Sequence, residues 1–235
     1  MMKDEYDFSK GERGKFVRGE MPLAPPVHLE PEMDLRVERA RKILRVLAAE
    51  GLQICLGIAF IEASDRHRFM SNLPNEVTAI TELTRDGVLL RLAMATARVT
   101  DHPMPDRDTI GGLCSLLKDP GVVAMVALNG NHQRLEQGLR RWRHLRDDKG
   151  LTPLRTSRNC RFAHSVSSNW SASASGPYLT HELTISLAKD TLRVIDDLLI
   201  GCNGASGLDN HSRFCSESAD SYFSVFRTFG AKPLV

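Results

Sequence analysis

The residues best suited to chemistry lie at positions 158–165, in the order Arg-Asn-Cys-Arg-Phe-Ala-His-Ser. Arg158 and Arg161 can each bind phosphate oxygens through two parallel hydrogen bonds, and Asn159 adds an amide. His164 can give or take a proton near neutral pH. Metal-free cleavage of a phosphodiester needs both functions, because charge grows on the phosphate oxygens while a proton moves. The alternative is a surface arginine beside a histidine that interacts with a helix end.

Spacing limits how Arg158 and His164 can act together. They are six residues apart, which is about 240° around a regular helix, so they point to different faces. They can share a site only if Arg158 lies off the helical path, or if two copies of the segment meet across a dimer axis.

The cluster ends a strongly basic segment. Residues 134–161 contain nine basic and three acidic residues, a net charge of +6 in a chain whose total is +2. A local basic stripe on a nearly neutral protein is typical of a polyanion-binding surface. A solvated helix face rich in arginine has the same composition, so charge alone does not separate the two interpretations.

Arg158-Asn159 followed by His164 resembles the arginine-polar…histidine motif of HEPN domains, a helical family that includes many bacterial RNase toxins. The sequences SRNCRFAHS, around the motif, and LLRLAMATARVTD, at 89–101, look most like the AbiU-type abortive-infection branch. The resemblance covers about residues 33–200. It implies an all-α bundle, usually a homodimer whose two motifs form one composite cleft, and metal-independent endoribonuclease activity in a toxin–antitoxin or phage-defence system.

The resemblance also implies residue roles. His164 would act on the attacking 2′-hydroxyl or the leaving oxygen, Arg158 would hold the scissile phosphate, and Asn159 would position the phosphate or His164. The products would be 2′,3′-cyclic phosphate and 5′-hydroxyl ends. We add Arg161, which lies one helical turn before His164, as a candidate RNA contact. Arg155 and Ser165 are further candidates for substrate binding.

No cofactor is expected, and a metal site is not expected either, because the eight histidines never form a close metal-like pair. The main alternative function is a catalytically silent helical module that binds RNA or a protein partner through the basic face. An enzyme needs His164, whereas phosphate binding depends mainly on arginines and falls with salt. A purely structural bundle with a dimer interface is a third option.

The elements that must position these residues are predicted to be helices. Apolar spacing indicates helices or short apolar segments over 35–60, 74–99, 108–117, 121–128, 132–148, 154–164, 178–200 and 209–229. No run alternates as a strand would. The predicted fold class is therefore an all-α, antiparallel helical bundle.

Particular residues are expected to set the helix ends. Asp108 is predicted to cap the third helix, Thr152 and Pro153 to start the sixth, and Gly201 to stop the seventh. Asp101-His102, followed by prolines, is expected to be a structured helix end rather than a catalytic pair. In the second helix, the residues expected to face inward are Val77, Ile80, Leu83, Val88, Leu92 and Ala95.

Residues 1–32 are expected to form a tail separate from the bundle of residues 33–235. They are rich in glycine and proline and poor in large apolar residues, so they cannot offset the entropy of ordering. The sequences YDFSKG, RGKF and PVHLEPE within them are similar to the N-terminus of small bacterial antitoxin-like proteins. That implies a segment, or a separate antitoxin, that inhibits the bundle. A leader without a role is equally expected.

The sequence predicts a cytoplasmic protein without a membrane span. The longest uncharged stretch of the most apolar region is 51–61, eleven residues, short of the about 20 that a bilayer needs. The first residues carry mixed charges and lack the apolar core of a secretory signal. The five cysteines are scattered and form no C-x-x-C pair, as in a reducing compartment.

Overall fold

The computed structural model describes residues 31–67, 75–157, 180–203 and 207–230. The regular elements in these ranges are all α-helices, and they contain no strand, so the predicted all-α fold class is confirmed. The helices are α1 (Pro31–His67), α2 (Asn75–Val99), α3 (Ile110–Leu116), α4 (Pro120–Val126), α5 (His132–Arg146), α6 (Leu151–Ser157), α7 (His181–Asn203) and α8 (Asp209–Gly230). The predicted tail, apart from the two residues that open α1, lies outside the described residues.

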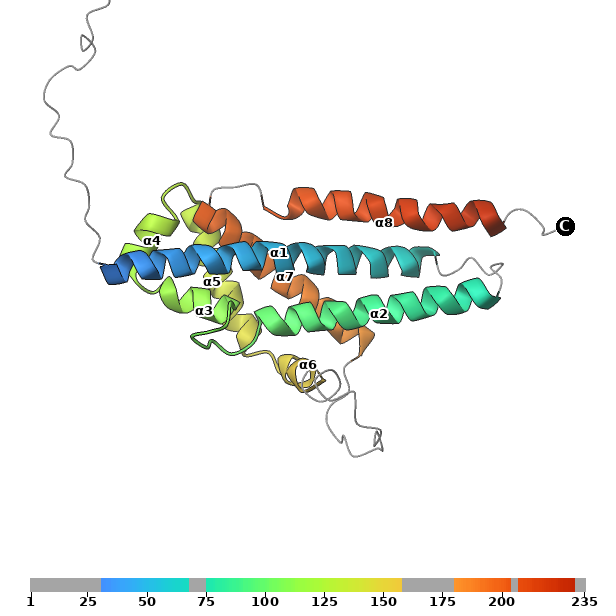
Figure 1. Cartoon of the computed structure of the whole chain (residues 1–235), viewed down its shortest axis with the longest axis horizontal. Coiled ribbons are helices and arrows are strands. Elements are labelled where there is room, and N and C mark those ends of the chain that lie inside the picture. The colour runs from blue at the N-terminus through green and yellow to red at the C-terminus, as the bar shows by residue number, and fades with distance from the viewer. Residues whose placement is uncertain (1–30, 68–74, 158–179, 204–206, 231–235) are drawn as a thin grey trace, which may run out of the picture.

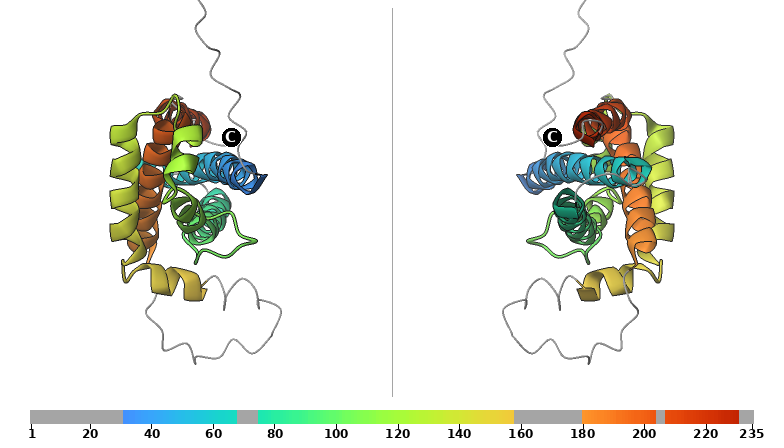
Figure 2. Two further views of the ribbon diagram at one scale, coloured as in Figure 1. Left: turned by 90° about the vertical axis from the view of Figure 1, so that its left-hand side faces the viewer. Right: turned by 90° about the vertical axis from the view of Figure 1, so that its right-hand side faces the viewer.

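The long helices form two sets that cross each other (Figures 1 and 2). One set consists of α1 with α2 and α8 on its two sides, and the other of α7 with α5 on its outer side. α1 and α2 run antiparallel, as do α5 and α7, whereas α8 runs in the same direction as α1. The main core lies where the two sets meet, and its largest fully buried side chains include Leu47, Ile54, Leu92 and Ile195.

The central helix, α1, has the length and composition of a membrane-spanning helix. Half of its most apolar window is buried inside the fold, where Leu47 and Ile54 pack in the core. Core helices of soluble proteins pass the same test, so this is weak evidence for a membrane. The absence of a membrane span therefore stays a prediction.

Two predicted helix starts are corrected by the structure. Thr109, not Asp108, caps α3. Thr109 is the residue directly before the helix, and its side chain accepts a hydrogen bond from Gly112 N at 3.1 Å. Asp108 instead pairs with Arg39 on α1 at 2.8 Å. α6 begins at Leu151, so Thr152 and Pro153 lie inside its first turn, where a proline leaves no hydrogen bond unmade. The predicted continuation of this helix to 164 lies outside the described residues.

The prediction that Gly201 stops α7 is also wrong, since the helix runs through it to Asn203. A Cβ atom at Gly201 would lie 2.6 Å from Cα of Leu135 on α5. The glycine is therefore needed for close approach of two helices, which requires only a missing side chain and does not end the helix.

The inward face predicted for α2 is only partly correct. Leu92 and Ala95 are buried, but Ile80 and Leu83 are 65% and 74% exposed. Periodicity locates an apolar stripe without showing whether a second element covers it. The N-terminal half of α2 thus carries apolar side chains that the described part of the chain leaves in solvent.

Candidate functional site

The predicted catalytic cluster cannot be placed. Arg158, Asn159, Arg161, His164 and Ser165 all lie outside the described residues. The structure does place Arg155 and α6, the helix that directly precedes the cluster in the sequence.

Arg155 joins α6 to the end of α2. It is half-buried, and its Nη2 donates a hydrogen bond to the carbonyl oxygen of Thr100, directly after the last residue of α2. Carbonyls at a helix C-terminus lack partners inside the helix, and a guanidinium is a strong donor to them. Arg155 therefore fixes α6, which ends at Ser157, to the end of α2.

Asp101 strengthens the same junction. Its buried carboxylate accepts a hydrogen bond from the backbone N of His102 at 3.0 Å and forms an ion pair with Arg107. The side chain thus closes the end of α2 and holds the following turn, as the sequence predicts for a structured helix end.

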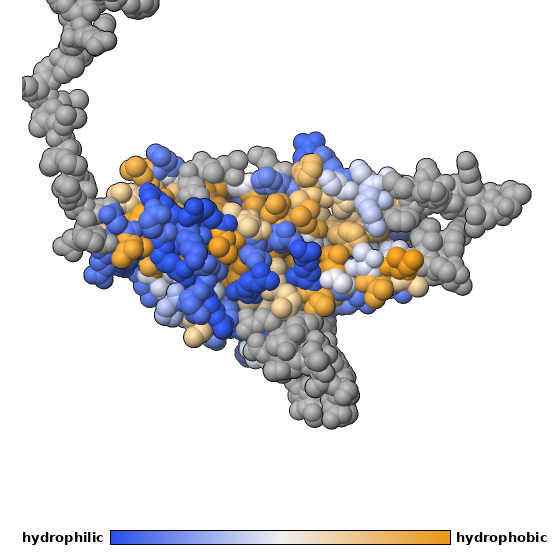
Figure 3. Space-filling view, in the orientation of Figure 1, coloured by the Kyte–Doolittle hydropathy of each residue, from blue (hydrophilic) through white to orange (hydrophobic). Residues whose placement is uncertain are grey.

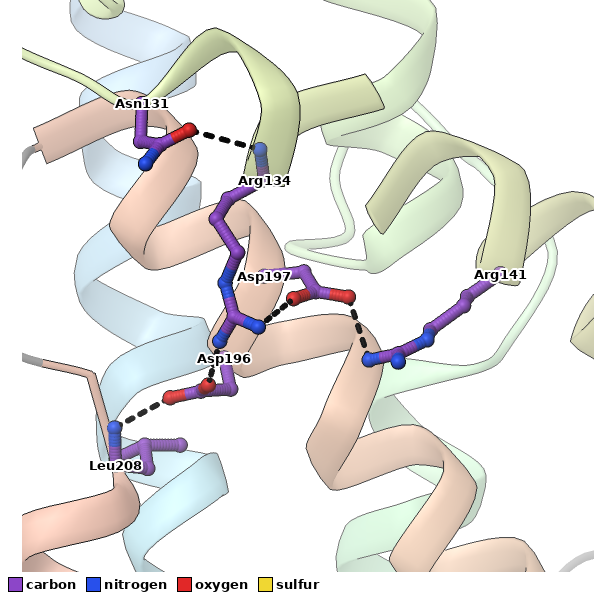
Figure 4. Close-up of polar contacts among 6 residues, drawn as sticks. All are labelled: Asn131, Arg134, Arg141, Asp196, Asp197 and Leu208. Carbon is purple, nitrogen blue, oxygen red and sulfur yellow. Dashed lines mark hydrogen bonds and ion pairs between the residues drawn. The ribbon is translucent and has the colours of Figure 1, made fainter. Parts of the chain in front are cut away.

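The best-defined polar arrangement lies between α5 and α7 (Figure 4). Arg134 bridges two neighbouring carboxylates, with Nη2 2.7 Å from Asp196 Oδ2 and Nη1 3.0 Å from Asp197 Oδ1. Arg141 binds the other oxygen of Asp197 at 2.7 Å. The second oxygen of Asp196 accepts a hydrogen bond at 2.6 Å from the backbone N of Leu208, just before α8. These four charged side chains are called the α5–α7 charge cluster below.

Local sequence explains why α5 reaches this position. Asn131 caps the helix by accepting a hydrogen bond from Arg134 N at 3.1 Å, and the two arginines, seven residues apart, lie on one face. Glycine keeps the helices close: a Cβ at Gly138 would lie 3.0 Å from Asp197 Cβ, and one at Gly130 would overlap the carbonyl of Gly201.

The buried carboxylate of Asp197 determines the electrostatics of the cluster. Its side chain is 0% exposed. Burial raises its pKa above the ordinary value for aspartate, although the charges of Arg134 and Arg141 act in the opposite direction. A buried acid between two cations acts here as a structural ion pair that holds α5 on α7.

A cleft of about 190 Å³ opens beside the cluster. Arg134, Arg141 and Arg193 line it together with Asp196 and Ser212, and two leucines form its apolar part. The carboxylates of α7 already bind Arg134 and Arg141, and Asp190 binds Arg193 at 2.9 Å. The cleft therefore carries balanced charge and does not concentrate positive potential for a polyanion.

The structure changes the meaning of the basic segment. Arg134 and Arg141 neutralise acids on α7, and Arg155 binds backbone. Cations that face solvent include Arg140 and Arg143 on α5, next to the exposed His144. These three residues are called the α5 basic face below. A charge count along the sequence overestimates the surface charge, because it leaves out counterions that are distant in the chain.

Sequence reasoning missed Asp196 and Asp197. The signal in the sequence was a pair of adjacent acids, flanked directly by Ile195 and Leu198, inside an otherwise apolar stretch. Acids on a buried helix face need cationic partners, but nothing in the pattern shows that those partners lie about 60 residues earlier.

Comparison of the chain with protein-family models, with curated proteins and with solved structures finds no match.

Proposed function

We propose that the protein is a metal-independent endoribonuclease of a prokaryotic toxin–antitoxin or phage-defence system. The observation that carries the proposal is the Arg158–Asn159…His164 motif in the sequence. Two features of its surroundings support it: the motif follows α6, which Arg155 fixes to α2, and the chain exposes the α5 basic face.

In the proposed reaction, the ribose 2′-oxygen attacks the adjacent phosphorus and the bond to the 5′-oxygen breaks. His164 takes the proton from the 2′-hydroxyl or gives one to the leaving 5′-oxygen. Arg158 holds the non-bridging oxygens, on which charge grows, and Asn159 positions the phosphate or His164. The products are a 2′,3′-cyclic phosphate and a 5′-hydroxyl.

The proposal includes a homodimer in the cytoplasm, because two motifs that meet across a two-fold axis overcome the angular separation of Arg158 and His164. It also includes inhibition by an antitoxin or by residues 1–32. Arg161 and Ser165 are proposed to contact RNA. Arg155 is assigned a positioning role, since it already donates to the carbonyl of Thr100.

The test compares wild type with His164→Ala on mixed cellular RNA in EDTA. His211→Ala is the matched control, because it removes another exposed imidazole, from α8, outside the motif and the α5 basic face. Cleavage should disappear in His164→Ala and persist in His211→Ala, with equal circular dichroism and oligomeric state. Equal cleavage by wild type and His164→Ala contradicts the proposal.

One observation favours the alternative of a catalytically silent module that binds RNA or a partner. The α5 basic face presents cations to solvent without needing the motif. In that case RNA affinity should fall in Arg140→Gln/Arg143→Gln, the salt dependence should become shallower, and His164→Ala should leave affinity unchanged. Arg213→Gln, which removes an exposed charge from α8, is the control.

A further inference from the structure

The outer face of α2 carries a continuous apolar stripe. Its members are Ile80, Leu83, Gly87, Leu90 and Met94, which are separated by three or four residues and so lie on one side of the helix. Ile80 and Leu83 are mostly exposed, Leu90 is exposed and Met94 is half-buried. A Cβ atom at Gly87 would meet nothing within 4 Å. These five residues are called the α2 stripe below.

The α2 stripe is open to approach by another molecule. The opposite side of the helix packs in the core through Leu92, whose Cδ1 would lie 3.1 Å from a Cβ atom added at Gly57 on α1. α2 lies at the edge of its helical set (Figure 2), and apolar side chains appear at the surface over it (Figure 3). A partner can therefore bind the stripe without displacing core residues.

The spacing of the stripe matches a two-stranded coiled coil. Ile80, Gly87 and Met94 occupy the first position of successive heptads, and Leu83 and Leu90 occupy the fourth. In parallel coiled coils, a β-branched residue at the first position with leucine at the fourth, as at Ile80 and Leu83, favours two strands. The missing side chain of Gly87 lets two backbones approach closely in the middle of the stripe.

Charges beside the stripe favour the same arrangement. Asp86 and Arg91 are exposed on opposite edges of the stripe, and no described residue forms an ion pair with either. In a parallel pair, Asp86 faces Arg91 of the partner subunit. An antiparallel pair places each edge against the same edge of the second copy, so that this attraction is lost.

We propose that the α2 stripe binds the α2 stripe of a second copy of this chain, as a parallel pair across a two-fold axis. The proposal goes beyond RNA cleavage, because it concerns how copies associate, and it gives the proposed homodimer a surface. Since α6 packs on α2, the pair puts both α6 helices at the same end of the dimer.

Sedimentation equilibrium of the full chain tests the surface. Wild type should reach twice the chain mass of 26.2 kDa at concentrations up to about 200 µM, the range of a small interface. Leu83→Glu should weaken association at least about tenfold by burying a charge in the stripe. Leu128→Glu is the matched control, because Leu128 is 77% exposed and lies after α4. A monomeric wild type, or equal association of the two variants, overturns the proposal.

A charge exchange tests the orientation. Asp86→Arg should weaken the dimer by placing like charges together, and the double variant Asp86→Arg/Arg91→Asp should restore it. Failure of the double variant to associate like wild type overturns the parallel arrangement. Mass reports association and RNA end groups report cleavage, so a failed dimer and a failed ribonuclease proposal give different results.

Discussion

The α5–α7 pair and the α1–α8 pair are held together by different forces. α5 and α7 approach so closely that Gly201 has no room for a methyl group, and Asp197 is buried between two arginines. α8 packs mainly on α1, through Phe223 and a small second core, with an exposed ion pair between Arg66 and Asp220 at 2.8 Å. Because its contacts are buried charge and backbone, substitutions in the α5–α7 pair should destabilise the fold strongly. Loss of the exposed ion pair between α1 and α8 should lower stability only slightly.

Asp196 connects the two regions. It binds Arg134 on α5 and the backbone N of Leu208 before α8, and the Leu208 side chain packs where Gly51 of α1 leaves space. The position of α8 on α1 therefore depends partly on the α5–α7 charge cluster.

The largest effect is expected from Gly201→Ala. The new methyl group meets the backbone of Leu135, which cannot rotate away, so unfolding free energy should fall by about 3 kcal/mol. Gly112→Ala in α3 is the control: its methyl group would make only ordinary contacts, the nearest at 3.4 Å from Thr109, and alanine should raise helix stability by about 0.5–1 kcal/mol. Urea unfolding measures both, and equal effects of the two variants contradict the close approach.

Removing one cation from each pair should come next in size. Arg134→Met leaves the buried Asp197 with one partner and the Asp196 carboxylate without its arginine, and should cost about 2 kcal/mol. Arg66→Met removes an exposed ion pair and should cost about 0.5 kcal/mol or less. Chemical denaturation of the two variants measures the difference, and the reverse order would show that the α1–α8 pair carries the greater electrostatic stability.

The pH dependence of stability should have opposite sign at the two acids. Burial raises the pKa of Asp197, so the folded state binds the Asp197 proton more tightly than the unfolded state does. The contribution of Asp197 to the free energy of unfolding therefore decreases as pH rises from the unfolded-state pKa through the folded-state pKa. A hydrogen bond from Arg66 lowers the pKa of Asp220, so its contribution is present above the unfolded pKa and is lost as pH falls through the folded one. Carboxyl NMR titration measures both directions, and a lowered pKa at Asp197 would show that the charges of Arg134 and Arg141 outweigh the effect of burial.

Helix positions could be predicted from the sequence, whereas contacts between distant helices could not. Helix spacing located α2 and α5 well, because burial of one face repeats locally along the chain. It missed the role of Gly201 and the pairing of Asp197 with Arg141, since both depend on which distant helix lies opposite. It also placed Ile80 and Leu83 inside, because an apolar stripe looks the same whether this chain or a second copy covers it. The catalytic cluster was proposed from sequence alone, and its residues lie outside the described part of the chain.

Metal-free attack by a ribose 2′-hydroxyl can be tested with two RNA pools that differ only at that hydroxyl. Wild type is incubated in EDTA with an RNA oligonucleotide pool and with the same pool 2′-O-methylated throughout, and the product ends are identified by mass spectrometry. We expect only the unmodified pool to be cut, with 2′,3′-cyclic phosphate and 5′-hydroxyl ends. Cleavage of the methylated pool, 5′-phosphate ends, or no cleavage of either pool would contradict it.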